Sequence, residues 1–86
     1  MNISEVRVRK VEGKDKFKAW ATVTFDNALR LHGFKVIEGK DGPFVAMPSR
    51  KLPSGKFIDI AYPLNQELRG MIQEKILEEY NRQEGP

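Results

Sequence analysis

Three cations, Arg50, Lys51 and Lys56, lie on one short stretch that also contains Pro48 and Pro53. Proline fixes the backbone φ angle, so such a stretch loses less conformational entropy when a ligand orders it. Lysine and arginine both neutralise phosphate, and arginine can also donate two parallel hydrogen bonds to it. The spacing therefore predicts a phosphate-binding loop carried by Arg50 and Lys51. The residues alone are equally consistent with a solvated loop that binds nothing.

Further candidates for phosphate or base contacts lie elsewhere in the chain. Ser49 offers a hydroxyl and a backbone N–H, and Arg69 falls in the first turns of an expected helix, where backbone N–H groups attract anions. Trp20, Phe34 and Tyr62 are able to stack on bases, although aromatic side chains in strands are more often buried. The candidate nucleic-acid-binding set is Ser49, Arg50, Lys51, Lys56 and Arg69, with Arg7 and Arg9 as assisting cations.

Catalytic and metal chemistry find little support in the sequence. Cysteine is absent and His32 is the only histidine, so no second histidine or thiolate is present to complete a zinc site. Asp26, Asp41 and Asp59 lie beside expected turns or on an expected strand, with no spacing that pairs them for acid–base work. We therefore expect no enzymatic activity, no metal site, no cofactor and no small-molecule substrate.

The charges divide unevenly along the chain. Residues 1–63 hold twelve lysines and arginines against seven acids, whereas residues 64–86 hold three against five. Clustered cations displace counterions from phosphate backbones, so this asymmetry suits a polyanionic partner; ordinary solubilising charge gives the same composition. The chain lacks the ~18 consecutive apolar residues that a membrane-spanning helix needs. We expect a cytoplasmic protein without a membrane partner.

Hydrophobic alternation predicts three consecutive strands in the first half of the chain, at residues 3–11, 17–25 and 29–38. Asp26 and Asn27 supply turn chemistry between the second and the third strand. Short links between the strands favour an antiparallel meander. One face of the second strand is expected to hold Phe17, Ala19, Ala21, Val23 and Phe25, with Trp20 opposite; the third strand is expected to place Leu31 and Ile37 on one side and His32, Phe34 and Val36 on the other.

Two short apolar runs at residues 44–47 and 57–61 flank the cationic loop and are expected to form further strands. Asn65 is a good N-cap for a helix that runs to about Asn81. Gly70 within it suggests a close backbone approach to the sheet, to a partner subunit or to nucleic acid, and packing is the favoured reason. These elements predict a single α+β domain over residues 1–86. We expect an antiparallel sheet of about five strands followed by one C-terminal helix packed on the sheet, with residues 82–86 as a frayed tail.

The stretch FKVIEGKDGPFVAMPSRKLPSGKFIDIAYPLN, followed by LRGMIQEKILEEY, resembles the stage V sporulation protein G (SpoVG) family, also called septation regulators. The similarity covers essentially the whole chain and includes EVRVRKV and AWATVTFDN. The resemblance implies a small bacterial α+β protein that forms dimers partly through strand contacts. It also implies that the protein binds DNA or RNA and influences septation, sporulation or related gene expression.

The central family pattern, FVAMPSR followed by G.F.DIA.P, falls on residues 44–50 and 55–63. Its apolar members are most simply residues of the core or of a dimer interface: Phe44, Val45, Met47, Phe57 and Ile60. Pro48, Pro53 and Gly55 shape the loop. The resemblance therefore favours Arg50 and Lys51 as the residues that contact nucleic acid.

Two classes of function follow from these observations. In the first, a homodimeric regulator contacts DNA or RNA through two loops that carry Arg50 and Lys51. In the second, a protein-interaction module of the division or sporulation machinery uses a sheet edge for strand addition and binds no nucleic acid.

Overall fold

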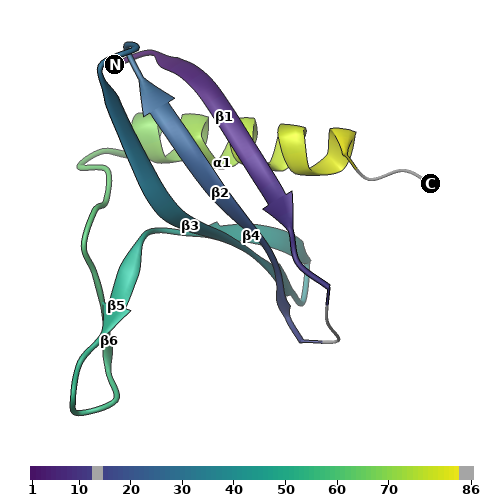
Figure 1. Ribbon diagram of the computed structural model, residues 1–86, viewed down its shortest axis with the longest axis vertical. Helices are drawn as coiled ribbons and strands as arrows, with labels where there is room; N and C mark the ends of the chain where they lie inside the picture. The colour runs from purple at the N-terminus through teal and green to yellow at the C-terminus, as the bar shows by residue number, and fades with distance from the viewer. Residues whose placement is uncertain (13–14, 84–86) are drawn as a thin grey trace.

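The computed structural model describes residues 1–12 and 15–83, which form a four-stranded sheet, a two-stranded hairpin and one helix. All strand pairs are antiparallel, and the order in the larger sheet is β1-β2-β3-β4. This arrangement confirms the predicted α+β class, in which an antiparallel sheet is followed by a helix packed on it (Figure 1). The strands of the larger sheet are β1 (Ile3–Lys10), β2 (Phe17–Phe25), β3 (Leu29–Gly39) and β4 (Gly42–Ala46).

The turn between β2 and β3 has the chemistry that the sequence predicts. Asp26 and Asn27 both have a φ of 52°, and the Ala28 amide donates to the Phe25 carbonyl at 2.9 Å. Positive φ at both central positions of this turn gives the twist that the two antiparallel strands need. The Asp26 carboxylate also accepts from the Asn2 amide at 2.9 Å, which ties the start of β1 to this turn.

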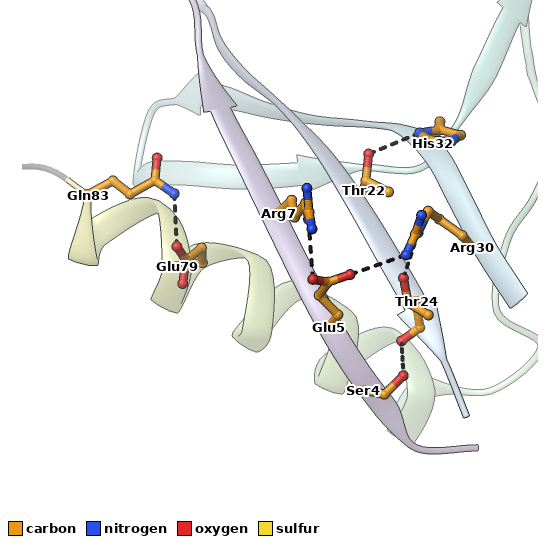
Figure 2. Close-up of polar contacts among 9 residues, drawn as sticks. All are labelled: Ser4, Glu5, Arg7, Thr22, Thr24, Arg30, His32, Glu79 and Gln83. Atoms are coloured by element: carbon orange, nitrogen blue, oxygen red, sulfur yellow. Dashed lines mark hydrogen bonds and ion pairs between the residues drawn. The ribbon is translucent and has the colours of Figure 1, made fainter. Parts of the chain in front are cut away.

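The helix α1 (Gln66–Arg82) covers one face of the larger sheet and contacts β1, β2 and β4. Asn65 caps it as predicted, because its side-chain oxygen accepts from the Leu68 amide at 2.8 Å. At the other end, hydrogen bonds from Gln83 and Arg82 lower the pKa of the Glu79 carboxyl; Figure 2 shows the bond from Gln83. The buried core between sheet and helix consists of Val8, Ala19, Ala21, Val23, Phe25, Phe34, Val36, Val45, Met47, Ile72 and Ile76.

One irregularity in β2 moves Phe17 away from the face that alternation predicts. The pairing with β3 shifts between Phe17 and Ala19, so Lys18 has no residue opposite it on β3. The ring of Phe17 consequently lies edge to face with the ring of Trp20, at a centroid distance of 4.8 Å. The prediction that Phe17 shares the core face of Ala19 was therefore wrong, because one extra residue reverses the side-chain alternation.

A second irregularity lies in β3, where His32 and Gly33 together oppose Thr22. Gly33 has a φ of +99°, a conformation that other residues rarely adopt. The extra residue places His32 on the uncovered face of the sheet and turns Leu31 toward Phe34, with which it lines an apolar hollow. The predicted faces of His32 and Leu31 were therefore wrong, and both errors have this one cause.

The predicted fifth strand does not join the larger sheet. Residues of the second apolar run form β6 (Phe57–Asp59), which pairs with β5 (Ser49–Lys51) in a separate hairpin. We call residues 49–59 the basic arm. Figure 1 shows the arm extending away from the sheet, and residues 60–65 lead from it back to the start of α1.

Gly70 is a position within α1 at which the contribution of helix propensity to stability can be tested. Apart from its chain neighbours and the nearby backbone of the helix itself, a Cβ atom built on Gly70 would meet no atom of residues 1–12 and 15–83 within 4 Å, so these residues show no close approach to the sheet. Gly70→Ala should raise the free energy of unfolding by about 1 kcal/mol, because alanine restricts the unfolded chain and favours the helix. Urea unfolding followed by circular dichroism measures the change. Gly33→Ala, at a positive φ, should have the opposite effect, and a destabilised Gly70→Ala would mean that another chain contacts this position.

Of the tail predicted at residues 82–86, Arg82 is the last residue of α1 and Gln83 is its C-cap, whereas residues 84–86 lie outside the described part of the chain. Within residues 1–12 and 15–83, no helix is both long and apolar enough to cross a membrane.

Candidate nucleic-acid interface

The backbone of the basic arm is closed by short hydrogen bonds. Its strands pair Ser49 with Asp59, Arg50 with Ile58 and Lys51 with Phe57. In the connecting loop the Leu52 amide donates to the Lys56 carbonyl at 2.7 Å, and the Gly55 amide donates to the Leu52 carbonyl at 2.9 Å. The loop is therefore a restricted one, which lowers the conformational entropy that a bound ligand would remove.

The arm presents cations on more than one side. Arg50, Lys51 and Lys56 are all exposed, and none of them has an ion-pair partner among the described residues. Successive side chains of a strand point to opposite faces, so Arg50 shares one face of the hairpin with Ile58 and Lys51 shares the other with Phe57. The one carboxylate within the arm belongs to Asp59, which lies opposite Ser49 at the base. All charged side chains in the outer part of the arm are thus cations.

The structure brings four of the five predicted site residues together. Ser49, Arg50 and Lys51 form β5, and Lys56 ends the loop that follows. Ser49 is half-buried, whereas the three cations are exposed. Arg69 is half-buried on α1, and Figure 1 shows the arm extending away from that helix. The arm therefore forms the candidate site, and Arg69 belongs to a different surface.

A second basic surface lies on the sheet face opposite α1. Register places the side chains of this face in three rows across β1, β2 and β3, which we call the open face. Figure 2 shows the polar contacts of two rows on the side of the sheet away from the helix. The rows consist of Glu5, Thr24 and Arg30; of Arg7, Thr22 and His32; and of Arg9, Trp20 and Lys35.

One carboxylate holds two of the open-face cations. Glu5 accepts from Nε of Arg7 at 3.2 Å and from Nη2 of Arg30 at 3.3 Å, while Nε of Arg30 donates to the Thr24 hydroxyl at 3.0 Å (Figure 2). The side chains of Arg7 and Arg30 are 65% and 54% exposed, so these ion pairs contribute little to stability. Their effect is to hold two guanidinium groups in place across three strands.

The three aromatic residues considered for base stacking differ in how exposed they are. Phe34 is fully buried, so the suggestion that it stacks on bases was wrong. Trp20 is 44% exposed on the open face, and Tyr62 is exposed on the segment between the arm and α1. The ammonium group of Lys35 lies 5.4 Å from the centre of the Trp20 ring and 6.0 Å from that of Phe57 in the arm. Lys35 therefore connects the open face to the arm.

Sequence reasoning missed Arg30 and Lys35 as members of a basic surface. Both face the same side as Arg7 and Arg9 only because the irregularity at His32 and Gly33 shifts one part of β3 relative to the other. A glycine inside an alternating strand is a known sign of such a bulge, and this signal was available in the sequence.

Comparison with known proteins identifies a family and several relatives to which this chain is similar. A family model described as SpoVG matches residues 1–82. A relative from Clostridium perfringens, named "Putative septation protein SpoVG", is 54% identical over 82 residues, which cover 95% of this chain and 91% of the relative. Relatives with the same name from Caldicellulosiruptor saccharolyticus and Caldanaerobacter subterraneus are 50% and 52% identical and cover 93% and 95% of this chain. These two matches cover 91% and 90% of the relatives.

Proposed function

Because the chain belongs to the SpoVG family, we propose that it is a homodimeric, cytoplasmic protein that binds DNA or RNA and regulates septation, sporulation or related gene expression. The observation that carries this proposal is the basic arm. Arg50, Lys51 and Lys56 are exposed on a hairpin that extends from the fold, and they have no ion-pair partner among the described residues. No catalytic step is part of the proposal.

Phosphate is the ligand chemistry that suits this arm. A cation that is already ion-paired attracts an anion less strongly, because its partner offsets part of its charge, whereas these three need only lose water and counterions. The helix offers a poor alternative surface, because Glu74 and Glu78 are exposed on it and would repel a phosphate backbone. The distribution of charge therefore directs a polyanion to the arm and the open face.

Self-association is supported by the apolar side chains that follow the arm cations along the chain. Large apolar groups that are exposed together commonly mark an interface with another protein. A chain of this length also buries only part of its surface when folded alone. We propose a second copy of the chain as the partner. The side chains concerned are Phe57, Ile58, Ile60, Tyr62 and Leu64, of which Leu64 is 89% exposed.

The second candidate function, a protein-interaction module, is favoured by the edges of the larger sheet. Strands β1 and β4 each have one side without a neighbouring strand among the described residues. Such an edge can accept an extended peptide as a further strand. Under this alternative the arm cations have no ligand, and the protein binds nucleic acid weakly or not at all.

A salt titration separates the two functions. Binding to mixed-sequence DNA and RNA is followed by fluorescence anisotropy between 50 and 200 mM salt, a range over which phosphate contacts change affinity strongly. The proposed function predicts that log affinity falls linearly with log salt, with a slope near −0.9 per phosphate contact on duplex DNA and −0.7 on single strands. The absence of binding at low salt would favour the interaction module.

A further inference from the structure

The open face combines an accessible aromatic ring with several guanidinium groups. A hollow of about 300 Å³ on this face is lined by Arg7, Arg9, Trp20, Thr22, Arg30 and His32. Its volume lies at the lower end of the range for small-molecule sites, which suits one flat ring rather than an extended ligand. Arg9 has no ion-pair or hydrogen-bond partner among the described residues, and Arg7 and Arg30 share the single carboxylate of Glu5.

The open face is continuous with the basic arm. Lys35 lies over the rings of Phe17, Trp20 and Phe57, at 5.9, 5.4 and 6.0 Å from their centres. Phe57 shares its face of the arm with Lys51. Cations and aromatic rings therefore alternate along one path, from Lys51 and Phe57 on the arm, past Lys35 and Trp20, to Arg9 and Arg7.

We propose that the open face binds single-stranded nucleic acid, with one base stacked on Trp20 and phosphates held by Arg7, Arg9 and Arg30. Base stacking on an aromatic ring and a cationic groove along the backbone are the two contacts that single strands use. A base within a duplex is already stacked on its neighbours, so Trp20 can receive only an unpaired base. This inference rests on the proposed function and adds to it a preference for single strands over duplexes.

Trp20 also supplies the readout, because it is the only tryptophan in the chain. The full-length protein is titrated with a 12-nucleotide single strand of mixed sequence, as RNA and as DNA, and with the matching duplex. We expect saturable quenching of tryptophan emission by the single strands and little quenching by the duplex. The comparison of RNA with DNA shows whether the ribose hydroxyl contributes to binding.

Two sets of variants test the contacts, with labelled strands followed by anisotropy. Trp20→Leu should weaken single-strand binding about 5- to 150-fold and leave duplex binding within about twofold, because stacking is lost and phosphate contacts remain. Arg7→Ala with Arg9→Ala should make the salt slope on single strands shallower by about 1.4. Lys75→Ala removes an exposed cation from the helix and is the matched control, for which wild-type binding is expected.

The outcomes distinguish this inference from the function on which it rests. If nucleic acid binds while Trp20 emission stays constant, or if both sets of open-face variants bind like wild type, the open face is not the site and the arm alone carries the proposed function. If an acidic peptide such as poly-glutamate quenches Trp20 with the affinity of the single strand, the face recognises charge alone and the inference fails. If no nucleic acid binds, both proposals fail.

Discussion

Arg50→Ala combined with Lys51→Ala should weaken nucleic-acid binding by at least about 3 kcal/mol, roughly 150-fold, while the fold stays intact. A charge-assisted hydrogen bond contributes about 1.5–3 kcal/mol, and each arm of the double variant loses two such contacts. If four contacts are lost from a dimer, the salt slope on duplex DNA becomes shallower by about 3.6. Both side chains are exposed, so each substitution should change the free energy of unfolding by at most about 0.5 kcal/mol.

The matched control for this variant is Lys40→Ala combined with Lys75→Ala, which removes the same charge from exposed positions outside the arm. Its affinity should fall far less. An equal loss on all sequences would indicate contacts to phosphate, whereas loss of preference for the best site would indicate that Arg50 contacts a base edge. Wild-type affinity and salt slope in the arm variant would show that the arm is not the contact surface.

Ile60→Asp should dissociate the dimer. Ile60 is 60% exposed in the single chain and adjoins Ile58 and Tyr62, which are also exposed. A carboxylate in the middle of an apolar interface should cost about 2–4 kcal/mol and raise the dimer dissociation constant about 30- to 1,000-fold. Sedimentation equilibrium at micromolar concentration measures the constant, and circular dichroism confirms that the monomer is folded.

The matched control for Ile60→Asp is Ala28→Asp, which adds the same negative charge at an exposed turn position and should leave the dimer unchanged. Dissociation by Ile60→Asp should also weaken DNA binding, because two linked arms bind more tightly than one arm alone. A wild-type chain that sediments only as a monomer of about 10 kDa would refute the dimer and the paired-arm description with it.

The sequence predicted the strands and the helix of this fold better than it predicted which side of the sheet each side chain faces. Alternation located β1, β2 and β3 within one or two residues, and Asn65 fixed the start of α1, because these signals are local. Phe17, Leu31 and His32 were placed on the wrong faces because the extra residues in β2 and β3 reverse the alternation. The position of such an extra residue depends on tertiary contacts, and Gly33 was the only local sign of either irregularity in the sequence.

The candidate site was predictable in part, because some of its signals are also local in the sequence. Proline, glycine and cation spacing marked the arm, and the structure groups Ser49, Arg50, Lys51 and Lys56 there. Of the apolar residues assigned to a core or an interface, Val45 and Met47 are buried, whereas Phe44, Phe57 and Ile60 are exposed in the single chain. An apolar side chain looks the same in the sequence whether it packs inside its own chain or against another.

Nuclear magnetic resonance of the ¹⁵N-labelled full-length protein tests most directly whether the arm contacts nucleic acid. Amide signals are compared before and after saturation with a 12-nucleotide single strand and with its duplex. The proposed function predicts large shifts at Arg50, Lys51 and Lys56 with both ligands, and small shifts at Glu74 and Glu78 on α1. Shifts centred on α1, or an unchanged spectrum at saturating nucleic acid, would contradict it.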